Sequence, residues 1–88
     1  MKPTVKWLFF GTKGGANRIK IVKALKKRPF NANQLSKELN VSYKTIPHHI
    51  KVLKDNGLVE SSKERYGKIY YLSSKMENIY DEFEDMLK

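Results

Sequence analysis

The feature that most constrains the fold is a change in the spacing of apolar residues at Gly57. Before this glycine, apolar side chains recur every three or four residues, which is the period of amphipathic helices. After it, the sequence LVESSKERYGKIYYLS is typical of two short strands, Leu58 to Lys63 and Lys68 to Ser73, around a turn that contains Gly67. The helical period returns in residues 75–88. We therefore expect a mainly α-helical chain with one small β-hairpin.

Two helices are expected early in the chain. The first runs over about residues 16–27, after the glycine-rich break GTKGG. Asn31 and Gln34 have the spacing of a capping box, which opens the second helix over residues 32–39. Residues 3–10 are apolar and fit either a short helix or a strand.

The third helix is expected to follow a tight turn, with Ser42 as its N-cap and its end near Asn56. Pro47 would then be the fifth helical residue, where it removes one backbone hydrogen bond. A looser turn at the start, with regular helix from Thr45 onward, is the alternative.

The predicted order of elements is helix, helix, helix, hairpin, helix. This is the order of a winged helix-turn-helix, in which the helix after the turn enters the DNA major groove. The hairpin, or wing, lies against the DNA backbone or the minor groove. Since 88 residues allow one domain, we assign residues 11–74 to a winged-helix core and residues 75–88 to a C-terminal amphipathic helix.

The charge is divided unevenly along the chain. Residues 1–74 hold 16 Lys and Arg against 4 Asp and Glu, a balance of +12, whereas residues 75–88 hold 2 against 5, a balance of −3. A small, strongly basic domain attracts polyanions, of which nucleic acid is the commonest. We therefore expect double-stranded DNA as the partner, with a merely solvated basic surface as the plain alternative.

Several classes of protein are excluded or disfavoured by composition. The chain has no cysteine, which excludes disulfides, thiolate metal sites and cysteine nucleophiles. Its longest apolar run, Trp7 to Phe10, is far too short to span a membrane, and no signal peptide is visible. We expect a cytoplasmic protein without a membrane partner.

The glycines of GTKGGANR lack the spacing of a nucleotide-binding loop, so they indicate a turn. Lys13 and Arg18, which lie beside this turn, are candidates to touch a DNA phosphate.

The adjacent histidines His48 and His49 raise the question of a metal or catalytic site. Neighbouring residues on a helix point about 100° apart, and helical metal pairs are usually spaced three or four residues apart. We therefore expect no metal, no cofactor and no catalysis. The helical phase points His48 outward toward DNA, and it places His49 at the edge of the core stripe, where a packed, hydrogen-bonded histidine is the favoured interpretation.

The stretch LSKELNVSYKTIPHHIKVLKDNGLVES also resembles the reading unit of the ArsR-like winged-helix transcriptional regulators. The matching positions are Leu35, Leu39, Val41, Ser42, Thr45, His49, Leu53, Gly57, Leu58 and Val59. The stretch GGANRIKIVKALKKRPFNANQL is similar in particular to small archaeal members. The resemblance covers about residues 11–74 and implies DNA-binding regulation. Pro47 departs from the family pattern, and the thiol-rich motif of metal-responsive members is missing, so metal sensing is not implied.

The family's mode of binding implies three groups of DNA contacts. Those in or beside the major groove are Ser42, Tyr43, Lys44, Thr45, His48 and Lys51. Those of the preceding helix, which position the protein on the backbone, are Asn31, Asn33, Gln34 and Lys37. Those of the wing are Lys63, Arg65, Tyr66 and Lys68. Arg65 is the best candidate for the minor groove, and Tyr66 is equally well explained as a turn residue that covers the hairpin.

The last helix carries more apolar surface than an isolated tail needs, so it is expected to form a homodimer contact away from DNA. The residues expected at this interface are Trp7, Phe9, Met76, Ile79, Tyr80, Phe83 and Leu87. Packing within the chain's own core is the alternative. A dimer would present two reading helices to the half-sites of a palindromic promoter site.

The function predicted from the sequence is that of a sequence-specific DNA-binding transcriptional regulator, not an enzyme. The alternative is a winged-helix module for protein–protein contact or non-specific nucleic-acid binding.

Overall fold

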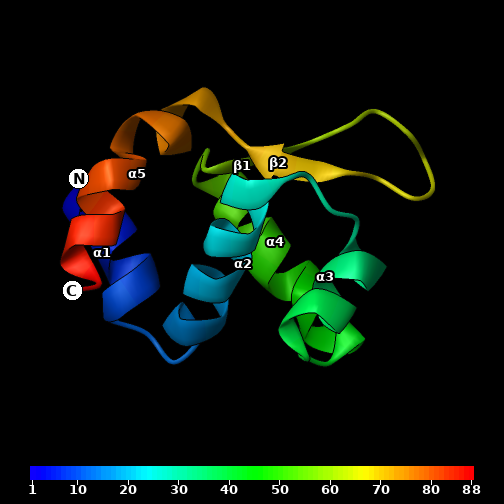
Figure 1. Cartoon of the computed structure of the whole chain (residues 1–88), viewed down its shortest axis with the longest axis horizontal. Helices are drawn as coiled ribbons and strands as arrows, with labels where there is room; N and C mark the ends of the chain where they lie inside the picture. Colours follow the sequence, from blue (N-terminus) through cyan, green and yellow to red (C-terminus); the bar gives the residue numbers. More distant parts are fainter.

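The structure is a computed structural model that describes all residues from 1 to 88. The helices are α1 (Pro3–Phe10), α2 (Gly15–Lys27), α3 (Ala32–Leu39), the short 3-10 helix η1 (Tyr43–Thr45), α4 (Ile46–Asp55) and α5 (Ser74–Met86). The strands β1 (Val59–Ser61) and β2 (Tyr70–Leu72) form one antiparallel hairpin. Figure 1 shows α1 and α5 together at one end of the molecule and the hairpin loop projecting at the other. The predicted winged helix-turn-helix is thereby confirmed.

Residues 3–10, for which the sequence left helix and strand open, form the helix α1. Pro3 occupies the start of this helix, where the missing N–H costs nothing. Val5, Leu8 and Phe9 face inward, and α1 lies against α2. Gly15 permits this close approach, because a Cβ atom there would lie 2.2 Å from the Phe9 carbonyl oxygen. The glycine-rich break is therefore a packing junction between two helices.

The predicted capping box opens α3 as expected. The Gln34 backbone N–H donates to the Asn31 side-chain oxygen (2.8 Å), and the Asn31 N–H donates to the Gln34 side-chain oxygen (2.9 Å). The helix ends at Asn40 in the left-handed conformation, with φ of 53°. Asparagine tolerates this conformation better than most residues do, so the tight turn before the reading helix follows from the sequence.

Of the two alternatives for the segment after Ser42, a single helix is wrong in its first turn, and the looser turn with regular helix from about Thr45 is confirmed. Residues Tyr43–Thr45 form a 3-10 turn, and regular α-helix begins at Ile46. Pro47 therefore occupies the second position of α4, where its missing N–H has no intrahelical partner to lose. The proline that looked unusual inside a longer helix is a start signal for a shorter one.

The hairpin is shorter than the two predicted strands. Pairing joins Val59 to Leu72 and Ser61 to Tyr70, and the chain between Ser61 and Tyr70 forms the loop of the wing. Phe30 adds an isolated bridge to Tyr70. The Phe30 N–H donates to the Tyr70 carbonyl with an N···O distance of 3.2 Å, and the Tyr70 N–H donates to the Phe30 carbonyl with an N···O distance of 2.8 Å. This bridge fixes the base of the wing to the segment between α2 and α3.

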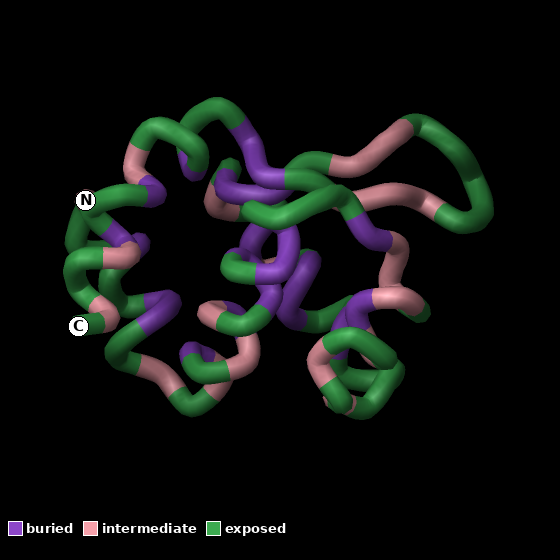
Figure 2. Tube along the Cα trace, viewed as in Figure 1, coloured by how far each residue is buried: buried purple, intermediate pink, exposed green.

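The core lies where α2, α4 and the hairpin meet and extends between α1 and α5, and Figure 2 shows its central part as a block of buried positions. Phe9 and Phe83 are both buried, and their ring centroids are 4.8 Å apart. Met76 and Tyr80 are buried as well. Four of the seven residues expected at a dimer interface, namely Phe9, Met76, Tyr80 and Phe83, are thus buried in the chain's own core and leave little surface for a second protein chain. The expectation is corrected accordingly.

This correction predicts the effect of truncating Phe83. Phe83→Ala should lower the free energy of unfolding by about 3–5 kcal/mol, because it leaves a cavity in the core. Tyr66→Ala, which truncates an aromatic side chain that is 84% exposed on the wing, is the matched control and should change stability by less than about 0.5 kcal/mol. Urea unfolding followed by circular dichroism measures both; equal effects would show that α5 does not belong to the core.

Candidate nucleic-acid interface

The outward face of α4 is set by its buried face. Ile46, Ile50 and Leu53 are buried in the core, so Lys44, His48 and Lys51 on the opposite side are exposed. This is the helical phase that the sequence predicts. Lys44 and His48 lie near the beginning of the reading segment, by which we mean η1 and α4 together. The Lys51 ammonium forms an exposed ion pair with Asp55 at 2.7 Å. Such pairs are weak, so the lysine remains free to exchange this partner for another anion.

The turn before α4 uses part of its polar chemistry to hold its own shape. The Ser42 hydroxyl accepts from the Lys44 N–H (3.3 Å), and the Thr45 hydroxyl donates to the Ser42 carbonyl (2.8 Å). Ser42 keeps its hydroxyl proton for donation, and Thr45 keeps an acceptor and a methyl group. Tyr43 is 54% exposed and has no hydrogen bond to its hydroxyl within the chain.

The predicted backbone-contact residues of α3 divide in the same way. Asn33 and Lys37 are exposed. The side-chain oxygens of Asn31 and Gln34 accept the two hydrogen bonds of the capping box, so the NH₂ groups of these side chains are left as donors. The role left to this pair is donation to an acceptor such as a phosphate oxygen.

The wing presents its charged residues to solvent. Lys63, Arg65 and Tyr66 are exposed, and Lys68 is half-buried. Gly67 adopts φ of +63°, which turns the chain at the tip. Glu64 lies among these cations, and a hydrogen bond from the Ser62 hydroxyl lowers the pKa of its carboxyl group.

A hollow of about 310 Å³ lies between the wing and the helix-turn-helix. It is lined by Asn31 and Asn33 from the start of α3, Tyr43 from η1, and Arg65, Tyr66 and Lys68 from the wing. The structure thus brings together six of the predicted DNA-binding residues from three separate segments. In Figure 1, α3 and the wing lie on the same side of the molecule, which agrees with this placement. Sequence periodicity carries no signal for the hollow, since it depends on how far the wing folds over the turn.

Arg18, which we expected at a DNA phosphate, is instead buried, with 5% of its surface exposed. Its guanidinium donates to the Leu8 carbonyl of α1 (2.9 Å), to Nδ1 of His49 on α4 (3.3 Å) and to the Thr12 hydroxyl. The expectation is wrong because the α1–α2 junction folds over this side chain. Three acceptors compensate a buried cation that has no carboxylate partner.

His49 is the packed, hydrogen-bonded histidine that the sequence favours. It is 6% exposed, and because the guanidinium can only donate, Nδ1 must be the unprotonated acceptor. Burial lowers the pKa of His49 first, and the nearby Arg18 and His48 lower it further. Neutral His49 is thus part of the contact that joins the reading helix to α2.

No three His, Cys, Asp or Glu side chains are arranged to hold a metal ion, and the His48 and His49 ring centroids are 5.3 Å apart. None of the helices has the length and apolar character that a membrane span needs. The absence of a cofactor stays a prediction from the sequence.

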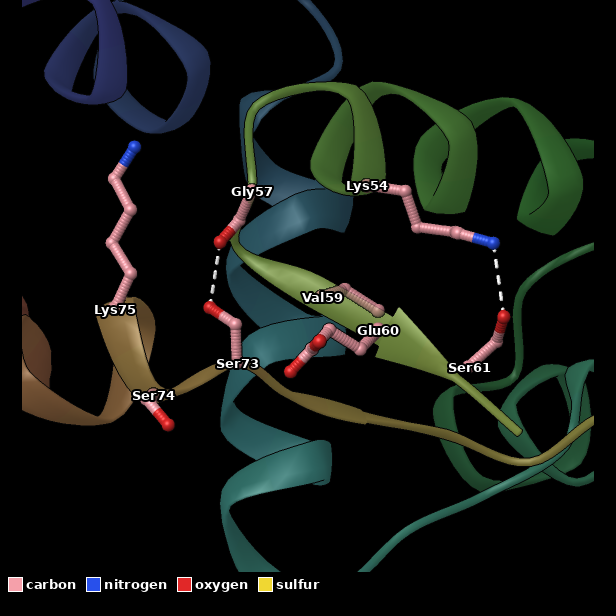
Figure 3. A pocket seen from close by; sticks show the side chains of 8 residues that line it. All are labelled: Lys54, Gly57, Val59, Glu60, Ser61, Ser73, Ser74 and Lys75. Carbon is pink, nitrogen blue, oxygen red and sulfur yellow. Dashed lines mark hydrogen bonds between the residues drawn. The ribbon is translucent and has the colours of Figure 1, made fainter. Parts of the chain in front are cut away.

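Figure 3 shows another hollow, of about 610 Å³, where α4, β1 and the start of α5 meet. Three of its polar side chains already donate hydrogen bonds within the chain. Lys54 donates to the Ser61 hydroxyl (2.9 Å), the Ser73 hydroxyl donates to the Gly57 carbonyl (2.6 Å), and Lys75 donates to the Asn56 carbonyl (3.2 Å). This hollow is a structural junction that holds the hairpin and α5 to the end of α4.

Comparison with known proteins places the fold among regulators. The family described as "Bacterial regulatory protein, arsR family" matches residues 16–61, just over half of the chain. A search of curated proteins finds no match. The narrower similarity to archaeal members receives no support from these findings.

Solved structures agree with the fold at low sequence identity. Rv0081 from Mycobacterium tuberculosis is 20% identical, with a TM-score of 0.75 over 99% of this chain and 91% of that one. HlyU from Vibrio cholerae is 22% identical, with a TM-score of 0.70 over 97% and 95% of the two chains. The homodimeric winged helix-turn-helix domain of Mb0332 from Mycobacterium bovis is 16% identical, with a TM-score of 0.71 over 82% and 68%.

The buried pair of Arg18 and His49 predicts a pH dependence of stability. Because the pKa of His49 is lowered in the folded state, the unfolded chain binds more protons below about pH 6.5, so the free energy of unfolding should fall as the pH drops from about 7 to 5. Above this window the contribution of His49 is fully present. Urea unfolding at several pH values measures the slope.

His49→Gln should reduce this slope, because it removes the group that titrates. His48→Gln, which replaces the exposed neighbouring imidazole, is the matched control and should keep most of the wild-type slope. An unchanged slope in the His49 variant would show that the loss of stability at acid pH comes from other groups.

Proposed function

The chain belongs to the arsR family of regulatory proteins, and we propose that it is a sequence-specific transcriptional regulator that binds a palindromic promoter site as a homodimer. The family and the fold are those of DNA-binding regulators rather than enzymes. The observation that carries the proposal is the convergence of the turn η1 before α4, the start of α3 and the cationic wing around one hollow, next to the exposed face of α4.

The major-groove contacts are assigned to the exposed face of the reading segment. Lys44 and Lys51 donate to guanine O6 and N7 or to a phosphate, and His48 donates or accepts. The turn uses the Ser42 hydroxyl as an acceptor and the Thr45 hydroxyl as a donor. Ser42 can therefore donate its hydroxyl proton to DNA, and Thr45 can accept through its hydroxyl oxygen. The 3-10 turn brings these residues to the beginning of α4, which is the end that enters the groove.

The backbone contacts are assigned to the hollow. When α4 lies in the major groove and the wing reaches the adjacent minor groove, the strand that separates the two grooves must pass between them. Asn31, Asn33 and Tyr43 stand on one side of that path, and Lys68 stands on the other. Gln34 and Lys37 extend the contacts along α3, and Lys63, Arg65 and Tyr66 follow the wing. Arg65 remains the candidate for the minor groove.

The dimer contact is assigned to the outer surface of α1 and α5. Trp7 is 62% exposed and Phe10 is 41% exposed on α1, although both are large and apolar. Ile79 on α5 and Leu87, which follows the end of α5, are partly buried against the core and present the rest of their surface outward. The Mb0332 domain, which shares this fold, is homodimeric. Exposed aromatic side chains at the end opposite the wing support a partner there.

Removal of Lys51 tests the reading face. Lys51→Ala should weaken binding to a duplex recovered by the wild type from a random library by about 1–3 kcal/mol, or roughly fivefold to 150-fold, if the side chain reads a base. Lys88→Ala removes an exposed lysine from the C-terminus and should leave affinity nearly unchanged. Fluorescence anisotropy at fixed salt measures both. Equal effects of the two changes would place the reading face elsewhere.

Substitution of Trp7 tests the dimer contact. Trp7→Glu should convert the dimer to a monomer, because a carboxylate replaces an apolar side chain at the centre of the proposed contact. Tyr66→Glu introduces the same charge at an exposed aromatic position on the wing and should leave the dimer intact. Sedimentation equilibrium measures both, and a dimer that survives Trp7→Glu would exclude this surface.

A further inference from the structure

A third hollow, of about 440 Å³, lies along one side of α2. α2 forms one wall, the end of α3 forms another, and α5 forms the third. In Figure 1, α2 lies between α3 and α5. None of the residues assigned to DNA binding or to the dimer contact lines this hollow.

The inner part of this hollow is apolar. Ala24 and Tyr80 are buried members of the core, and Leu39 is half-buried and packs against that core. The aliphatic stems of the α2 lysines extend the apolar wall toward solvent. A flat apolar group therefore finds contact on three sides.

The rim of the hollow is positively charged. Lys20, Lys23 and Lys27 lie on one face of α2, at spacings of three and four residues, and form no ion pair within the chain. Lys26, in contrast, pairs with Glu77 at 2.9 Å and stands 5.0 Å from the centre of the Tyr80 ring.

Two carboxylates also line the hollow, Glu38 and Glu84. Four lysines against two glutamates leave a net charge of +2 on the lining. The Tyr80 hydroxyl donates to Glu84 (2.8 Å), and burial, followed by the effect of Glu84, raises the pKa of Tyr80 to about 12. Tyr80 therefore adds no negative charge at neutral pH.

We propose that this hollow binds a small aromatic carboxylate, with its ring against Leu39, Ala24 and Tyr80 and its carboxylate among Lys20, Lys23 and Lys27. The charge complementarity selects an anion, and the apolar inner part selects a ring. A duplex is a poorer occupant, because its row of phosphates would meet Glu38 and Glu84 as well as the lysines. Such a ligand touches α3 and α5 at once. The inference goes beyond the proposed function and does not depend on it.

The test is a titration of the ¹⁵N-labelled full chain with 2-naphthoate, followed by NMR chemical shifts. We expect saturable shifts at the amides of Ala24, Leu39 and Tyr80. 2-Naphthamide, which has the same rings without the charge, and acetate, which has the charge without the rings, should each bind at least several-fold more weakly. Equal binding of the naphthoate and the naphthamide, or shifts that do not saturate, would overturn the proposal.

Lysine variants locate the charge. Lys20→Gln and Lys23→Gln should each weaken 2-naphthoate binding by about twofold to fivefold, as exposed charge pairs do. Lys6→Gln removes an exposed lysine from α1 and should have no such effect. Uniform effects of all three variants would contradict a site on α2. Naphthoate-induced shifts centred on Trp7 and Phe10 would likewise overturn the assignment. So would a result in which a DNA duplex, and not the naphthoate, shifts the amides of Ala24, Leu39 and Tyr80.

Discussion

The burial of one face of α4 is the constraint on which the rest of the molecule depends. Ile46, Ile50 and Leu53 insert into the core, and this fixes the rotation of the helix about its axis. Arg18 adds a directional contact, because its guanidinium joins the Leu8 carbonyl of α1 to His49 on α4. The orientation of the exposed face of the reading helix α4 is therefore fixed by contacts on its buried face, namely apolar packing and the hydrogen bond from the buried Arg18 guanidinium.

The same packing explains why the two ends of the molecule differ in character. The C-terminal residues carry a net charge of −3, and the buried side of α5 completes the core through Phe83. The wing and the start of the reading segment carry the cations at the other end. The end that holds the acidic α5, closes the core and presents the exposed aromatic residues of α1 is suited to a protein partner, whereas the cationic wing and reading segment are suited to a polyanion.

Much of the fold follows from local sequence signals. The phase of α4, the capping box at Asn31 and Gln34, and the order of elements are all set by interactions within a few residues of each other, so a single sequence reveals them. The looser turn before Pro47, which the sequence offered as an alternative to a longer helix, also follows from a local rule, since proline is favoured in the first turn of a helix.

The features that the sequence did not reveal depend on contacts between distant segments. The burial of Arg18 depends on how closely Gly15 lets α1 approach α2. The apolar stripe of α5 is equally consistent with a core and with a dimer, and the packing of Phe83 against Phe9 decides for the core. The hollow between the wing and the turn likewise brings together residues from three segments, at positions 31 and 33, 43, and 65 to 68, which no sequence periodicity connects.

The central claim is that one continuous face, formed by α4, the start of α3 and the wing, contacts DNA. The most direct measurement is a map of backbone amide shifts when the ¹⁵N-labelled protein binds a short duplex. We expect the largest shifts in residues 42–51 and 63–68, with smaller ones at the start of α3. Shifts concentrated on α2 or on α5, with the wing unaffected, would contradict it.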